Sequence, residues 1–125
     1  MRFEKGMVIF MNQIKIIADS TCDLSPELVK EFDISIIPLC ILLDVDSYAD
    51  GVEISPDEIY HWADKNKKTP KTAAPTPESI LKTLQLYVDQ KLDIIFFGIS
   101  EEMSTTCNVV RLMQEELGYD RIYVI

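Results

Sequence analysis

Short apolar runs alternate along the chain with segments whose apolar residues recur at helical spacing. The runs are nearly continuous, as expected of strands that are covered on both faces. They lie at 14–18, 34–38, 94–99 and 121–125. The helical segments lie at 25–32, 55–66 and 77–90, and a fourth one ends near Leu117. Strands that alternate with helices indicate βαβ units, so the pattern predicts an α/β fold, a parallel β-sheet flanked by helices on both faces.

Three of the predicted helices begin with the same local signal. A hydroxyl residue is followed by proline and then by an acid, at Ser25, Ser55 and Thr76. The hydroxyl caps free backbone N–H groups, proline suits the first helical position, and the acid complements the helix dipole. These signals set the helix boundaries and carry no information about function.

The segments around the second helix are less regular. Residues 40–54 predict an extension of the second strand and then a turn-rich excursion, and residues 69–77 predict a loop. The apolar side of the helix at 55–66 is expected to carry Ile59, Tyr60, Trp62 and Ala63.

The composition is that of one globular domain. The 125 residues are 47% hydrophobic and 26% charged, with a net charge of −9. This acidic balance disfavours nucleic acid as a partner, because phosphate binding needs clustered lysine and arginine. No apolar stretch approaches the roughly 20 residues that a membrane span needs. Residues 1–11 are expected to be an N-terminal extension or to precede an alternative start, and 12–125 to form the domain.

The cysteines indicate a reducing environment. There are three of them, Cys22, Cys40 and Cys107, and their spacing is not that of a zinc site. An odd number of scattered thiols favours a reduced, cytoplasmic protein without a metal site.

Hydroxyl-rich segments follow two of the predicted strands and precede the third helix. They are Asp19 to Thr21, Thr72 to Ala74 and Ser100 to Asn108. In an open α/β sheet, ligands bind beyond the carboxyl ends of the strands, so these three segments should converge there. Since a helix begins near Ser104, a carboxylate or a phosphate would suit this place. Simple helix capping by the same hydroxyls is the alternative explanation.

The sequence contains none of the familiar catalytic constellations. The only histidine, His61, lies within a predicted helix, and the nucleophile-elbow, dinucleotide-binding and phosphate-loop motifs are absent. We therefore expect no enzyme activity, no metal and no cofactor. One alternative is a small-molecule phosphate-handling enzyme that uses Asp19 or Asp23 as nucleophile or metal ligand.

Four segments of the sequence resemble motifs of the DegV family. The segment IKIIADSTCDLSPELVKEFDISIIPL resembles that family's opening, a strand followed by D-S-T, an acidic loop, a helix and a second strand. Three further segments of the family are matched by DGVEISPDEIYHW, PKTAAPTPESI and ISEEMSTTCNVV. The resemblance covers about residues 12 to 125 and rests on the combination of the four segments.

The resemblance implies a domain that supplies part of a lipid site. DegV proteins have an N-terminal α/β domain and a larger second domain, and a fatty acid is held between them. The carrier itself performs no chemistry, and some bacterial members deliver the fatty acid to a fatty acid kinase. The chain is then expected to end before the second domain and to bind a long-chain fatty acid. Because the surface that a second domain covers would be exposed, a homodimer of the chain is also expected.

The residues that match the family's headgroup contacts are expected to hold the fatty-acid carboxylate. They are Thr72, Ser100, Glu101, Ser104 and Thr106, with further loop contacts from Asp19, Ser20 and Thr21. The sequence departs from the family's pattern at Ala73, Ala74 and Glu101, where Ser, Gln and Ser are usual. An interaction or regulatory module with a degenerate lipid site is therefore a further alternative.

Overall fold

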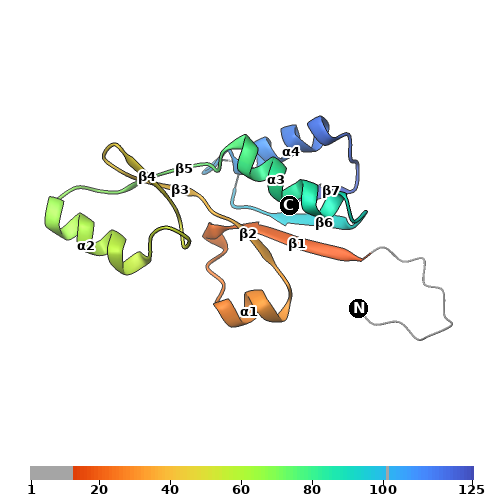
Figure 1. The fold of residues 1–125 in the computed structure, drawn as a ribbon. Coiled ribbons are helices and arrows are strands. Elements are labelled where there is room, and N and C mark those ends of the chain that lie inside the picture. Colours follow the sequence, from red (N-terminus) through yellow and green to blue (C-terminus); the bar gives the residue numbers. More distant parts are fainter. Residues whose placement is uncertain (1–12, 101) are drawn as a thin grey trace.

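Two β-sheets organise the chain. The computed structural model describes residues 13–100 and 102–125, so the predicted N-terminal extension, residues 1–11, lies outside the described residues. The described residues form a four-stranded and a three-stranded sheet, and the helices pack around them (Figure 1).

The larger sheet consists of parallel strands in the order β2-β1-β6-β7. These strands are β1 (Ile14–Asp19), β2 (Ser35–Ile37), β6 (Asp93–Phe97) and β7 (Ile122–Val124). The central strand β1 pairs with β6 from Ile14 opposite Asp93 to Ala18 opposite Phe97. The α/β fold with a parallel sheet, predicted from the alternation of strands and helices, is confirmed.

Helices lie on both faces of the parallel sheet. They are α1 (Pro26–Glu31), α3 (Pro77–Val88) and α4 (Thr106–Leu117). In Figure 1, α3 and α4 lie side by side on one face and α1 lies on the other. The predicted caps are present, since Ser25 Oγ accepts from the backbone N–H of Leu28 and Thr76 Oγ1 from that of Ser79. Gly118 ends α4 with a left-handed φ of 62°.

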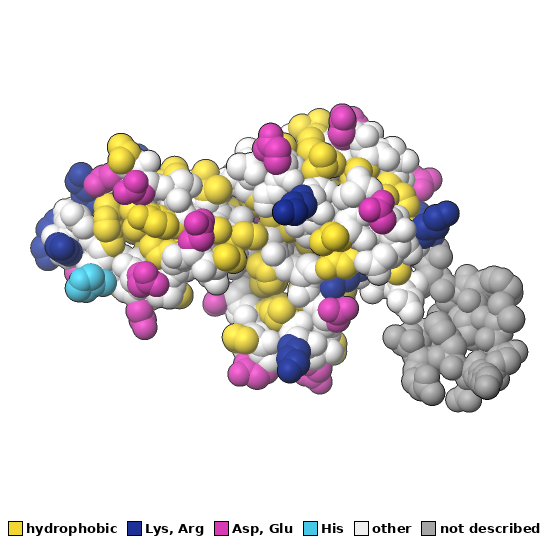
Figure 2. All heavy atoms as spheres, viewed as in Figure 1, with side chains coloured by type: hydrophobic (Ala, Val, Ile, Leu, Met, Phe, Trp, Pro, Cys, Tyr) yellow, Lys and Arg dark blue, Asp and Glu magenta, His cyan; other side chains and the backbone are white. Residues whose placement is uncertain are grey.

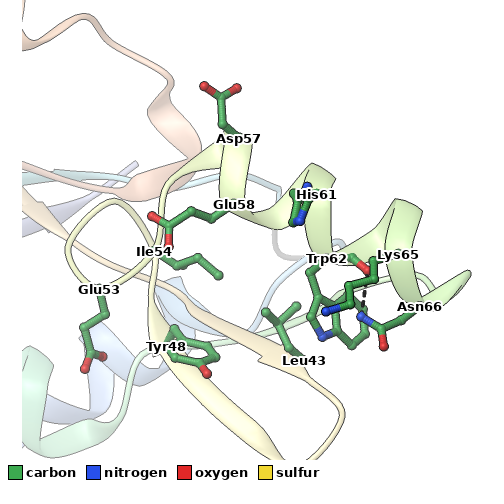
Figure 3. Close-up of a pocket in the computed structure, with 10 residues that line it drawn as sticks. All are labelled: Leu43, Tyr48, Glu53, Ile54, Asp57, Glu58, His61, Trp62, Lys65 and Asn66. Atoms are coloured by element: carbon green, nitrogen blue, oxygen red, sulfur yellow. Dashed lines mark hydrogen bonds between the residues drawn. The ribbon is translucent and has the colours of Figure 1, made fainter.

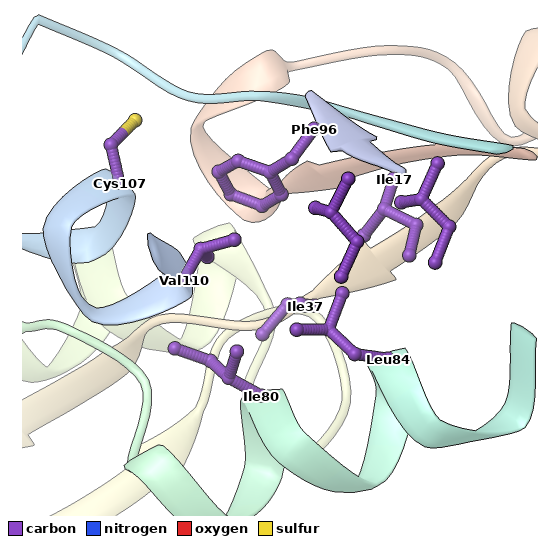
Figure 4. Packing of buried hydrophobic residues seen from close by; sticks show 9 residues of the cluster. Ile17, Ile37, Ile80, Leu84, Phe96, Cys107 and Val110 are labelled. Atoms are coloured by element: carbon purple, nitrogen blue, oxygen red, sulfur yellow. The ribbon is translucent and has the colours of Figure 1, made fainter. Parts of the chain in front are cut away.

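The main core lies between the parallel sheet and the pair α3 and α4 (Figure 4). Apolar side chains from both helices and from every strand of the sheet meet there and are almost completely buried. They are Ile17, Ile37, Ile80, Leu84, Ile94, Phe96, Cys107, Val110 and Ile122. This packing fixes the carboxyl ends of β1 and β6 relative to the first turn of α4.

The opposite face of the parallel sheet is covered less. The short helix α1 buries none of its residues. Phe97 and Tyr123 remain 43% and 52% exposed, and Ile14 and Ile125 more than 60%. The homodimer that was expected from an uncovered surface stays a prediction.

A second sheet was not predicted. It is antiparallel, with the order β4-β3-β5, and its strands are β3 (Cys40–Leu43), β4 (Asp46–Ala49) and β5 (Lys71–Ala73). Cys40–Leu43 forms a separate strand of this second sheet, so the prediction that it extends the second strand is wrong. The turn-rich excursion is wrong for β4, and the plain loop at 69–77 is wrong for β5. All three residues of β5 are exposed, and its partner β3 is distant in sequence. The three exposed residues of β5 show no alternation of apolar and polar positions by which a strand could be recognised.

The helix α2 (Pro56–Asn66) packs on the antiparallel sheet. A small core of Ile41, Leu43 and Ile54 is covered by Trp62 and other half-buried side chains. The start of α2 is held by a capping box, in which Ser55 and Glu58 each accept from the other's backbone N–H. Tyr60, predicted on the apolar side, is 67% exposed, whereas Ile59 and Trp62 of the same helix pack against the small core.

Among the described residues, none of the helices combines the length and the apolarity that a membrane crossing requires. Acidic side chains are spread over the face shown in Figure 2, and several basic side chains gather beside His61 at the end of α2. Three of that basic group, Lys65, Lys67 and Lys68, are exposed, which agrees with a solvated helix end.

Candidate functional site

A pocket of about 450 Å³ lies beyond the carboxyl end of β1, at the junction of the two sheets. The three hydroxyl-rich segments meet there, each contributing at least one side chain. The lining residues are Thr21, Leu39, Thr72, Ala73, Ala74, Ile99, Glu102, Met103, Ser104 and Thr105. The topology rule for open parallel sheets thus places the segments as expected from the sequence.

The loop after β1 is held by its own side chains. Asp19 caps the 3-10 helix η1 (Ser20–Cys22), because its Oδ1 accepts from the backbone N–H of Thr21 at 2.8 Å and from the Thr21 hydroxyl. Asp19 is only 1% exposed. These bonds hold Thr21 at the wall of the pocket. Ser20 faces elsewhere, and its Oγ accepts from the backbone N–H of Leu39 at 3.0 Å.

The second wall comes from the antiparallel sheet. Thr72 stands at the middle of the edge strand β5, opposite Ile41 of β3. Ala73 and Ala74 follow it along the same wall. Since alanine side chains offer no hydrogen bond, Thr72 is the polar group of this wall.

The third wall is the segment that leads into α4. Ser104 Oγ accepts from the backbone N–H of Thr106 at 3.2 Å and lies 2.8 Å from Thr106 Oγ1. Thr106 is 1% exposed and lies behind Ser104, outside the lining. Thr105 is the N-cap of α4 and makes no side-chain cap bond. The first turn of α4 therefore begins directly at the pocket, with its positive dipole end toward it.

Gly98 lets the walls approach each other. A Cβ at this position would overlap Cys107 Sγ, would lie 3.1 Å from Phe96 Cε2 and would approach Asp19 Oδ2. Only glycine leaves room for α4 to pack this closely against the end of β6. The signal is present in the sequence as a glycine within the third apolar run, but its reason is visible only in the structure.

The predicted site residues are separated by the structure into three groups. Thr72 and Ser104, together with Thr21 from the loop, line the pocket. Asp19 and Thr106 are buried behind these residues. Ser20 and Ser100 lie outside the lining, and Ser100 Oγ instead accepts from the backbone N–H of Glu102 at 3.2 Å. Glu101 lies outside the described residues.

Several lining residues had no role in the sequence-based site. They are Leu39, Ile99, Met103 and Thr105. The first three are apolar and give the pocket a side on which hydrocarbon can lie. Leu39 follows the second apolar run directly and Ile99 ends the third, so their positions beside the strand ends are the signal that could have identified them.

The charge among the described lining residues of the pocket is negative. Within 13–100 and 102–125, no Lys, Arg or His lines it, whereas Glu102 does. The described part of the chain also contains no group of three His, Cys, Asp or Glu side chains that could hold a metal ion.

The phosphate-handling alternative finds no support in the geometry. Asp19 is buried and bonded to its own loop. Asp23 ends η1 with a left-handed φ of 53° and lines a different cavity, beside Leu24 and Pro26 of α1. The two carboxylates therefore do not face one pocket in which they could act on the same substrate.

A larger cavity of about 790 Å³ lies between α2 and the antiparallel sheet, lined by Leu43, Tyr48, Trp62 and neighbouring residues (Figure 3). Two of its polar groups are engaged in holding α2 itself. Glu58 belongs to the capping box, and Asn66 donates to the carbonyl of Trp62. We interpret this cavity as loose packing of a helix on a narrow sheet, and the smaller pocket at the strand ends as the candidate site.

Comparison with known proteins gives one consistent family. A family model described as uncharacterised proteins of the DegV family matches residues 13–125. A DegV domain-containing protein of Clostridium perfringens is 37% identical over 115 residues, which are 92% of this chain and 41% of the relative.

Solved structures give the same result. The chain resembles a stearic acid-binding protein from Eubacterium ventriosum with a TM-score of 0.81 and 34% identity, over 90% of this chain and 41% of that one. It resembles a DegV family protein from Thermus thermophilus, described by its fatty acid binding, with a TM-score of 0.79 and 27% identity, over 90% and 40%. The chain thus spans about two fifths of the length of these relatives.

Proposed function

The chain belongs to the DegV family, and from this premise we propose that it supplies one part of a fatty-acid-binding site. The observation that carries the proposal is the meeting of Thr21, Thr72 and Ser104 in one pocket beside apolar side chains. A few convergent polar groups next to an apolar surface suit a ligand with a small polar head and a hydrocarbon chain. Binding of fatty acids by similar structures supports the same ligand class.

The residues have distinct proposed roles. Thr72 and Ser104 contact the headgroup from two sides of the pocket, and the first turn of α4 contributes its dipole. Thr106 acts through Ser104, and Asp19 acts through Thr21. Hydrocarbon lies against Leu39 and its apolar neighbours in the lining. Ser100 and Ser20 have no direct role in this arrangement of the chain.

The chain acts as a carrier and performs no chemistry on the lipid. Presentation of the fatty acid to a fatty acid kinase and a cytoplasmic location are part of this proposal, as is the homodimer. None of the described cysteines forms a disulfide with another described cysteine, which agrees with a reducing compartment. The exposed apolar face that includes Phe97 and Tyr123 supports association of two chains.

Native mass spectrometry of the purified 125-residue chain tests the proposal. We expect masses that correspond to bound long-chain fatty acid, and displacement of a fluorescent fatty acid by added unlabelled acid. Ser104→Ala and Thr72→Val should each weaken binding about tenfold, the effect of losing one hydrogen bond of roughly 1.4 kcal/mol.

Thr69→Val is the matched control for the Thr72 variant. Thr69 is exposed and lies outside the pocket, so its substitution should leave binding unchanged. Absence of lipid from the purified chain, together with no displacement signal, would refute the proposal. A degenerate site, as in the regulatory alternative, predicts the same negative result, and the two alanines in the lining are the observation that favours it.

A further inference from the structure

The two polar walls of the pocket have opposite hydrogen-bonding character. On one wall, the Thr21 hydroxyl donates to Asp19 Oδ1, which also accepts from the backbone N–H of Thr21. A hydroxyl has one proton, so Thr21 Oγ1 can offer the pocket only its lone pairs. Thr21 is therefore an acceptor toward any ligand.

Behind Thr21 lies the Asp19 carboxylate, of which one oxygen has no hydrogen-bond partner among the described residues. This oxygen, Oδ2, is buried. Its position between the end of β1 and Gly98 keeps it out of water. This oxygen adds negative potential to the wall that Thr21 presents.

The segment before α4 can present a donor to the pocket. Ser104 Oγ accepts from the backbone N–H of Thr106, and the Thr106 hydroxyl lies within hydrogen-bonding distance of it. When Thr106 Oγ1 donates to Ser104, the Ser104 proton is free to point into the pocket. The positive end of the α4 dipole lies at the same wall. In this arrangement, one of the two that the Ser104–Thr106 contact allows, Ser104 is the donor in a pocket that Thr21 also lines as an acceptor.

We propose that this pocket selects an uncharged headgroup which carries a donor and an acceptor together, namely a protonated carboxylic acid or a primary amide. The headgroup donates its O–H or N–H to Thr21 Oγ1, and its carbonyl accepts from Ser104. Asp19 is the positioning residue, because it holds the Thr21 proton. The inference rests on the proposed function and specifies which form of the lipid this chain takes.

The charges around the pocket agree with an uncharged ligand. Among the described residues, the titratable side chain in the lining is Glu102, in the segment before α4, and Asp19 lies behind Thr21 at the end of β1. On the wall that Leu39 and β5 form, the described lining residues are not ionisable, and the exposed Lys71 beside Thr72 lines a different cavity. A bound carboxylate would have two negative neighbours and no cation among the described lining residues.

A comparison of decanoic acid with decanamide tests the inference on the 125-residue chain. Only the acid changes its charge, so we expect its affinity to fall on the order of 100-fold between about pH 6 and about pH 8, as its uncharged fraction falls. The affinity for decanamide should be the same at both pH values. Equal or tighter binding of the ionised acid than of the amide at about pH 8 would overturn the inference and leave lipid binding intact. If neither compound binds at either pH, the proposed function itself fails.

Two variants separate the charge of Asp19 from the acceptor of Thr21. Asp19→Asn removes the charge and keeps an acceptor for Thr21, so the acid at about pH 8 should bind about tenfold tighter and the amide unchanged. Thr21→Val removes the acceptor and should weaken the amide about tenfold, while ionised acid is weakened less. Asp23→Asn is the control of equal charge change, at an exposed left-handed position that asparagine tolerates. If Asp23→Asn changes the acid-to-amide ratio as much as Asp19→Asn does, the effect is general electrostatics and the positioning role is refuted.

Discussion

The two sheets of this molecule differ in how much core each of them has. The parallel sheet and its helices α3 and α4 share a cluster of nine buried residues, whereas the antiparallel sheet and α2 share three. α3 and α4 each contribute buried residues, and α2 contributes none. Stability should therefore be concentrated in the parallel half.

The candidate pocket uses both halves. Thr21 and Ser104 stand on the well-packed parallel half, and Thr72 stands on an exposed edge strand of the other. The link between the halves runs through Leu39, whose N–H donates to Ser20 Oγ and whose carbonyl accepts from the N–H of Asp50. One wall of the site is thus rigid, and the other can open with α2 without loss of the main core.

The largest expected effect breaks the parallel half. Phe96 is completely buried in the main core, and Phe96→Ala should lower the free energy of unfolding of the whole chain by about 3–5 kcal/mol. Leu43→Ala, in the small core, should cost about 2 kcal/mol, and mainly in its own half. Urea unfolding measured by circular dichroism reports the whole chain, and fluorescence of the single tryptophan, Trp62, reports the antiparallel half.

The comparison of the two signals decides whether the halves are separate. For Leu43→Ala we expect the Trp62 midpoint to move to lower urea while the main circular dichroism transition stays in place. For Phe96→Ala both should move. Coincident transitions that shift together in both variants would show one cooperative unit and contradict the difference in stability between the halves.

The same difference explains which parts of the fold could be predicted from the sequence. The parallel half has continuous apolar runs and helices with strong start signals, and both are local patterns. One exception is Lys15, which lies within an apolar run and is 6% exposed, because its ammonium group donates to the carbonyl of Asp33 and lies over the ring of Tyr87. The antiparallel half depends in part on pairing between β3 and the distant strand β5, and the exposed β5 carries no pattern that could predict it.

The candidate site was predictable to a similar degree. The rule for strand ends accounts for Thr21 and Ser104, which follow β1 and β6, whereas Thr72 reaches the pocket through the antiparallel strand β5. The burial of Thr106 and the outward position of Ser100 depend on how the segment before α4 folds, and no spacing in the sequence encodes that conformation. That the Thr21 hydroxyl donates its proton within its own loop likewise follows only from the contact with Asp19.

A smaller effect is expected at the glycine where the main core meets the pocket. Gly98→Ala should cost about 1–3 kcal/mol, because the new methyl group overlaps Cys107 Sγ and α4 must shift. Since Ser104 precedes α4, lipid binding should weaken as well. The double variant Gly98→Ala/Cys107→Ala provides room and should recover most of the loss, as a double-mutant cycle of unfolding free energies would measure.

Gly51→Ala is the counterpart of this glycine substitution in the antiparallel half. Gly51 has a left-handed φ of 76° and nothing within 4 Å of an added Cβ, so the cost there is backbone strain alone, about 1 kcal/mol. This loss of stability should lower the urea midpoint of the Trp62 fluorescence transition, and lipid binding should stay unchanged. A Gly98→Ala variant that is as stable as the wild-type chain would show that the close approach of α4 is not required.

The smallest effects compare the same interaction in the two halves. Thr76→Ala removes the N-cap of α3 and Ser55→Ala that of α2, and each should cost about 1 kcal/mol. The loss at Thr76 should appear in the main circular dichroism transition, because α3 is part of the main core. The loss at Ser55 should appear only in the Trp62 transition, with the exposed Ser47→Ala as a control that changes neither. A Ser55→Ala variant that moves the main transition as far as Thr76→Ala does would mean that α2 unfolds with the core, and the wall that carries Thr72 would then be as rigid as the one that carries Ser104.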